Sequence, residues 1–194
     1  MKIIGTSLLL AAGLLFGQCS SEKVAPKLDY DKVSQAIMAQ LVPQLTGTWK
    51  LGRVHVQAQR LNAGQAEIGI RRDTVFQNFA VLTIRPAKVP ASSLPNPQYP
   101  DFEGDLTFQG KEYPVRFAPL ASPDRVVNGQ GPHAFFLLQF NLAPGSYPPD
   151  AGRTYLEDIG FINDNFTLEM LAGEQTMLWR GLSRGMVKIE LQKQ

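Results

Sequence analysis

The sequence predicts an all-β domain, an antiparallel eight- to nine-stranded meander barrel preceded by a short N-terminal α-helix. From Thr48 onward apolar and polar residues alternate with a period of two, as in "AFFLLQFNL" at 134–142, and hairpin signals such as Gln109-Gly110 separate the runs. The alternation slips near Gly52, which predicts a bulge that bends the first strand, as closing a sheet requires. The same alternation occurs in sandwiches, so the sequence leaves barrel and sandwich open.

Composition indicates one compact domain, because 44% of the 194 residues are hydrophobic and 19% are charged. The net charge is only +2, and the chain has no block of like charge. We therefore expect no nucleic-acid partner and no electrostatic attraction to an anionic membrane surface.

Residues 1–18 are typical of a cleaved export signal, with Lys2 ahead of an apolar run that is too short to span a bilayer. Cys19 follows this run and is the only cysteine. Its position resembles the lipobox of bacterial lipoproteins, although Gln18 departs from the small residue usual before the cysteine. We expect an exported protein that is lipid-anchored in the outer membrane through Cys19, with residues 19–28 as a tether. Ordinary cleavage nearby is the alternative, and the sequence leaves the membrane face open.

Residues 29–44 form the predicted helix. Val33, Ile37 and Leu41 recur at a spacing of four, which is typical of a helix with one apolar face. We expect the helix to end near Pro43 and to pack over the domain.

The domain proper covers residues 45–194, and its strand signals are regularly spaced. They lie near 48–60, 65–71, 75–85, 102–109, 111–118, 134–142, 166–171, 175–180 and 186–193. Three long connections, 86–101, 119–132 and 143–154, are rich in proline, which is consistent with binding loops and equally with stiffened surface excursions.

The motif "GLSRG" at 181–185 fits the G-x-S-x-G pattern of a nucleophile elbow centred on Ser183. An elbow needs a helix after the serine and then an acid and a histidine, but a strand-like segment follows and no histidine lies beyond Ser183. We therefore place Ser183 in the turn between the last two strands and expect no catalytic residue and no enzyme activity.

The other residues that could carry chemistry indicate neither catalysis nor metal binding. His55 and His133 lack partners at ligand spacing, so we expect no metal site. Asp101, Glu103 and Asp105 alternate as an exposed strand face would. No pattern indicates a cofactor.

The segment Gly47-Thr48-Trp49 matches the G-x-W motif on the first strand of the lipocalin family, within the calycin superfamily. With the N-terminal helix and the meander, the chain is most similar to the lipocalin-like lipoproteins of Bacteroidota, although the family's T-D-Y motif is missing. The resemblance implies that an arginine near the last strand, Arg184 or Arg180, lies across the Trp49 ring and closes the narrow end of the barrel.

We expect the barrel to bind a small apolar or amphipathic ligand at an open end. Candidate ligand-binding residues follow from strand parity: Leu82, Ile84, Val115, Phe117, Phe136, Leu138, Phe140, Phe166 and Leu168. The alternative is a filled barrel or sandwich that acts as an envelope interaction module or inhibitor whose partner is unknown. Exposed aromatic residues in the loops would favour the alternative, and the candidates are Tyr99, Phe102, Tyr147 and Tyr155.

Overall fold

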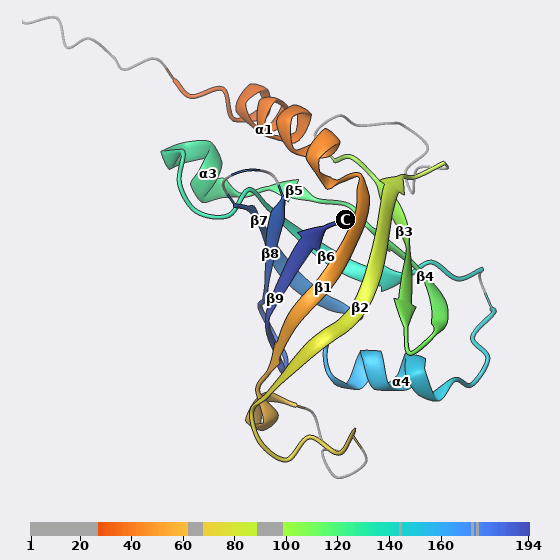
Figure 1. Ribbon diagram of the computed structural model, residues 1–194. Helices are drawn as coiled ribbons and strands as arrows, with labels where there is room; N and C mark the ends of the chain where they lie inside the picture. Colours follow the sequence, from red (N-terminus) through yellow and green to blue (C-terminus); the bar gives the residue numbers. More distant parts are fainter. Residues whose placement is uncertain (1–26, 62–67, 89–98, 144, 172, 174) are drawn as a thin grey trace, which may run out of the picture.

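The structure is a computed structural model that describes residues 27–61, 68–88, 99–143, 145–171, 173 and 175–194 (Figure 1). Its helices are α1 (Tyr30–Leu45), α3 (Pro123–Asn128), α4 (Ala151–Asp158) and the 3-10 helix η1 (Ala58–Arg60). Its strands are β1 (Gly47–Val56), β2 (Thr74–Pro86), β3 (Phe102–Phe108), β4 (Lys111–Phe117), β5 (Leu120–Ala121), β6 (Ala134–Phe140), β7 (Asp164–Met170), β8 (Thr176–Gly181) and β9 (Met186–Lys193).

The strands form a closed barrel, which confirms the predicted fold class. Their order is β4-β3-β2-β1-β9-β8-β7-β6-β5, and all the pairings are antiparallel. Pairing of β4 with β6, at Val115 with Phe140 and Arg116 with Gln139, closes a ring of eight strands. Strand β5 is an extra strand that pairs with the start of β6.

Strand β1 carries the bulge that the sequence predicts near Gly52, because its pairing with both neighbours shifts there. Trp49 and Leu51 before the shift and Val54 and Val56 after it are all buried. One extra residue therefore keeps both halves of the strand directed to the core while the strand bends.

The predicted strand at 65–71 is wrong for its described part, because residues 68–71 form no strand. Ile70 belongs to the buried core, as does Leu61 just after η1. A non-strand segment that buries one apolar residue imitates the alternation of a strand over so short a range. The sequence also has a hairpin signal at 62–64, and these residues lie outside the described ones.

Helix α1 covers nearly the predicted range, from Tyr30 to Leu45, and Pro43 lies inside its last turn. A proline in the last turn removes one backbone hydrogen bond from the helix. Leu41 before Pro43 and Leu45 after it are both buried and hold the helix on the barrel. The buried face consists of Ser34, Met38, Leu41 and Leu45.

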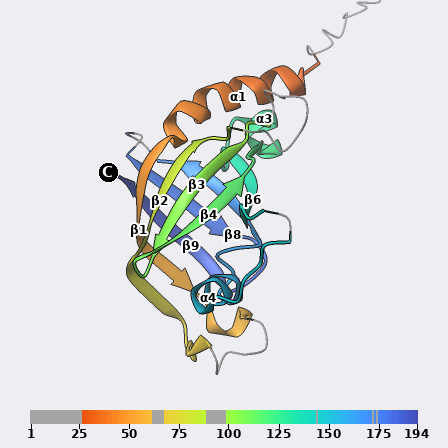
Figure 2. The same cartoon turned by 90° about the vertical axis from the view of Figure 1, so that its right-hand side faces the viewer.

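The end of α1 is bound to the barrel through its free carbonyl groups. The Trp49 Nε1–H donates to the Leu45 carbonyl at 2.8 Å, and Lys193 Nζ donates to the Gln44 carbonyl at 3.1 Å. Helix C-termini leave such carbonyls without intrahelical partners, so these two bonds fix both the end point and the direction of α1. Helices α1 and α3 lie at one end of the barrel and α4 at the other (Figures 1 and 2).

Helix α4 is held against β4 by Asp150. Its carboxylate caps the helix by accepting from the Arg153 backbone N–H at 2.9 Å, accepts from the Tyr113 hydroxyl at 3.0 Å, and pairs with Lys111. The hydrogen bond from Lys111, then the helix cap, lower the pKa of Asp150 to about 2.

We predict that Asp150→Asn lowers the free energy of unfolding at neutral pH, because asparagine still caps the helix but loses the ion pair. The folded pKa lies below the usual value of 3.8, so the contribution of Asp150 is present above about pH 4 and is lost as the pH falls toward 2. Urea unfolding at several pH values should show a gap between the two proteins that narrows from pH 4 to pH 2. Glu112→Gln, at an exposed position on β4, is the control, and a gap that stays constant with pH would contradict the assignment.

Candidate functional site

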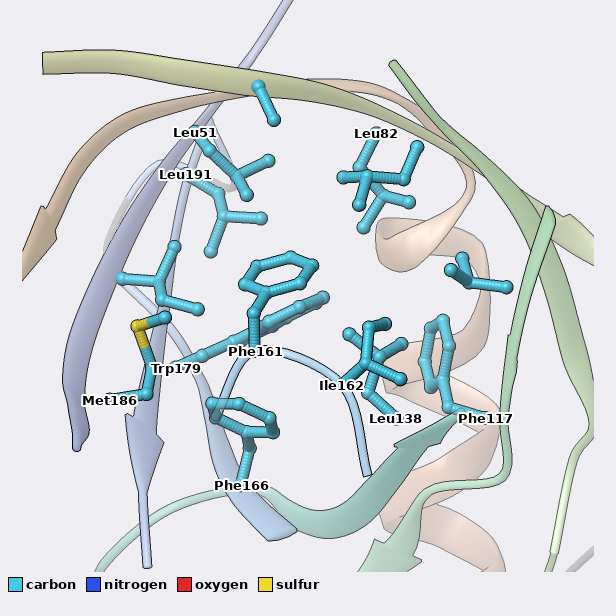
Figure 3. Packing of buried hydrophobic residues seen from close by; sticks show 14 of the residues in the cluster. Leu51, Leu82, Phe117, Leu138, Phe161, Ile162, Phe166, Trp179, Met186 and Leu191 are labelled. Atoms are coloured by element: carbon cyan, nitrogen blue, oxygen red, sulfur yellow. The ribbon is translucent and has the colours of Figure 1, made fainter. Parts of the chain in front are cut away.

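The interior of the barrel is filled by packed side chains (Figure 3). Trp179 lies at its centre, with ring centroids 4.8 Å from Phe136 and 5.9 Å from Phe166. Phe161, which precedes β7, enters from the α4 end and is fully buried. Aromatic pairs at such separations are each worth about 0.5–1.5 kcal/mol beyond the area they bury, so this packing is a stable core.

Both ends of the barrel are covered. At one end α1 buries Leu41 and Leu45 against the core. At the other end, the turn before β7 is fixed by Arg184, whose guanidinium donates to the carbonyls of Glu157 and Ile162. The buried carboxylate of Asp164 accepts from the backbone N–H of Arg184 at 3.1 Å.

Most of the nine residues predicted to bind a ligand belong to the buried core. Eight of them are at most 3% exposed and belong to one hydrophobic cluster: Leu82, Ile84, Val115, Phe117, Phe136, Leu138, Phe166 and Leu168. Of the nine, Phe140 alone lines one of four pockets on the described part of the chain, together with Leu142, Ala143 and Tyr147. Strand parity identified the inward face correctly, but it carries no information on whether that face encloses space.

The structure does not bring Trp49 into contact with Arg184 or Arg180, the pair that the resemblance implied. Lys193 is the cation over the Trp49 ring, with Nζ 5.3 Å from the ring centroid. Trp49 pairs with Lys193 across β1 and β9, whereas Arg180 pairs with Lys188 and Arg184 lies in the β8–β9 turn beyond the other end of β1. The resemblance therefore pointed to the wrong residue and to the wrong end of the last strand.

Ser183 lies in the turn between β8 and β9, as predicted, and it is exposed. Asp101 pairs with Arg116, and both Glu103 and Asp105 pair with Arg85, so these carboxylates belong to ion pairs on the outer face of the sheet. Among the described residues, no group of three or more His, Cys, Asp and Glu side chains could hold a metal ion.

One apolar pocket lies outside the barrel, between α1, β5 and α3, with a volume of about 300 Å³. Strand β5 and its partner β6 supply Leu120, Ala121 and Phe135 to its wall. The remaining lining residues are Tyr30, Asp31, Ser34, Tyr99 and Pro123. This size is at the lower end of the range for small-molecule sites.

Ser34 is the most deeply buried polar residue that lines this pocket. The residue is 6% exposed, and its Oγ has no hydrogen-bond partner in the described part of the chain. A helical serine usually bonds to a carbonyl one turn earlier, and a buried hydroxyl without a partner costs free energy. Ser122, buried and between two lining residues, has a second unpartnered Oγ. A polar group on a bound molecule would satisfy the Ser34 hydroxyl.

Sequence reasoning missed this pocket because its walls come from three segments far apart in the chain. One signal was available: Ser34 interrupts the apolar face that Met38, Leu41 and Leu45 continue at helical spacing. A small polar residue on a buried helix face has to meet a partner or a cavity.

Comparisons of the chain with protein-family models, with curated proteins and with solved structures found no match. The class therefore comes from the architecture alone. The chain forms an eight-stranded antiparallel meander barrel that is consistent with a lipocalin-like fold, with an N-terminal helix and one extra strand.

We predict that Phe161→Ala lowers the free energy of unfolding by about 3–5 kcal/mol, because it removes a buried aromatic ring from a closed interior. The cavity that is left should bind benzene, detected as a benzene-dependent rise in Tm that the unaltered protein does not show. Leu182→Ala, at a position that is 46% exposed, should change stability by less than about 0.5 kcal/mol. A loss below about 1 kcal/mol in Phe161→Ala would mean that the interior is not tightly filled.

Proposed function

We propose that the protein is a non-enzymatic, lipid-anchored protein of the cell envelope that binds a small amphipathic molecule in the pocket between α1, β5 and α3. The observation that supports this function is the pocket itself, an apolar cavity with the buried, unpartnered hydroxyl of Ser34 in its lining. Because the interior of the barrel is filled, the proposed site lies on its outer surface.

Export and lipid attachment rest on the N-terminal sequence, since residues 1–26 lie outside the described residues. No helix in the described part of the chain has the length and hydropathy to span a membrane. A lipid on Cys19 would provide the attachment, in the outer membrane.

An interaction module built on a filled barrel is the second candidate. It is favoured by three exposed apolar residues that line the same pocket, Tyr30, Tyr99 and Leu120. Two of the four loop aromatics expected to serve it are not available, because Phe102 is fully buried and Tyr155 stacks on Phe108. Tyr99 and Tyr147 are exposed, at 49% and 58%.

We predict that 1-octanol binds the full-length protein and that Leu120→Trp or Ala121→Phe, each of which fills the pocket, abolishes binding in isothermal titration calorimetry. Two blocking variants are used because the Ala121 side chain is the more enclosed of the two and its replacement is the more disruptive. Ala143→Phe, in a different pocket, is the matched control and should bind octanol as the unaltered protein does. Equal binding by all four proteins would exclude the pocket as the site, and a partner cross-linked at Tyr99 without octanol binding would favour the interaction module.

The anchor has its own test. We predict that Cys19→Ala in the producing cells abolishes palmitate labelling and moves the protein from the detergent phase to the aqueous phase, because the acylated residue is lost. A variant with Ser20→Ala retains the cysteine and should keep both properties. Labelling that persists in Cys19→Ala would exclude the lipid anchor without affecting the pocket.

A further inference from the structure

We infer that the pocket between α1, β5 and α3 selects a single-chain amphiphile whose head group is a hydrogen-bond donor with positive charge, a primary ammonium. This inference rests on the proposed function and names the ligand class of the same site. It depends on how polar and apolar groups are distributed around the pocket.

The polar groups lie on one wall. Asp31 and Ser34 both line the pocket from α1, and residues three apart on a helix share a face, with Cβ atoms about 5–6 Å apart. The opposite wall is apolar and consists of Leu120, Ala121 and Phe135. A bound molecule that satisfies both walls has an apolar body and one polar end, and the polar end faces α1.

The polar wall favours a cation over an anion. Within the described residues, Asp31 takes part in no salt bridge, so its carboxylate is available to a ligand. An ammonium carries three donors and no acceptor, which suits one carboxylate and one hydroxyl oxygen together. A carboxylate head group would be repelled by Asp31, and a neutral hydroxyl would satisfy Ser34 without gaining from the charge.

The size of the pocket favours a free molecule with one chain. A volume of about 300 Å³ is at the lower limit for small-molecule sites and gives no room for the two chains of a bilayer phospholipid. Tyr30 and Tyr99 also line the pocket and are 42% and 49% exposed, so their rings would pack on the part of the ligand chain nearest solvent.

The test compares three probes of equal chain length, octylammonium, 1-octanol and octanoate, by isothermal titration calorimetry on the full-length protein at pH 7. Octylammonium should bind most tightly and octanoate least. Asp31→Asn should weaken octylammonium about two- to fivefold, as expected for one partly exposed ion pair, and leave octanol unchanged. Ser34→Ala should weaken both octylammonium and octanol, because both use the hydroxyl.

Glu112→Gln removes an exposed carboxylate on β4, away from the pocket, and should change none of the three affinities. Octanoate binding as tightly as octylammonium, or an affinity for octylammonium that Asp31→Asn does not alter, would overturn the inference. With either result, the proposed function would still be supported if 1-octanol binds and Leu120→Trp blocks its binding. Failure of all three probes to bind would overturn both.

Discussion

Packing around Trp179 is the constraint on which the rest of the structure depends. An eight-stranded barrel has an interior just wide enough either to be filled or to hold one small ligand, and here the rings of Phe136, Phe161, Phe166 and Trp179 fill it. Phe161 comes from outside the strands, so the segment between α4 and β7 is part of the core rather than a mobile lid. A barrel filled in this way leaves its outer surface for the proposed binding site.

The helix α1 connects the scaffold to the proposed site. The indole of Trp49 and the ammonium of Lys193 each donate to a carbonyl at the C-terminal end of α1, and Lys193 also lies over the Trp49 ring. These contacts set the direction of the helix, and the direction places Asp31 and Ser34 against β5 three turns earlier. The position of the polar wall of the pocket therefore depends on residues at the far end of the helix.

Much of the fold could be predicted from the sequence because the burial of one sheet face imposes a period of two. The bulge near Gly52 was visible for the same reason, as a slip in the alternation. The turn at Gln109-Gly110, where both residues have positive φ, was visible as a hairpin signal. The end of α1 was predicted near Pro43 and lies at Leu45, because tertiary contacts on Leu41 and Leu45 outweigh the one hydrogen bond that Pro43 removes. The two-residue alternation alone also could not distinguish Ile70, a buried residue outside any strand, from a strand residue.

The candidate site could not be predicted, because a cavity is a property of how elements fill space and not of the pattern along any one of them. The alternation of apolar and polar residues along the strands correctly predicted that Leu82, Phe136 and Leu168 face the barrel interior. Whether an inward side chain lines a cavity depends on neighbouring residues that this pattern does not specify. The same limit applies to the cation over Trp49, since only the register of β1 with β9 places Lys193 there.

The place where the chain enters the domain adds a geometric argument. Nine residues, 20–28, separate Cys19 from Asp29, the residue that caps α1, and a fully extended segment of that length spans at most about 30 Å. With a lipid on Cys19, the first turn of α1 would stay within that distance of the membrane surface, and Tyr30 and Asp31 of that turn line the pocket. A short tether and a pocket built on the helix that follows it would keep the binding site close to the membrane, where single-chain amphiphiles partition.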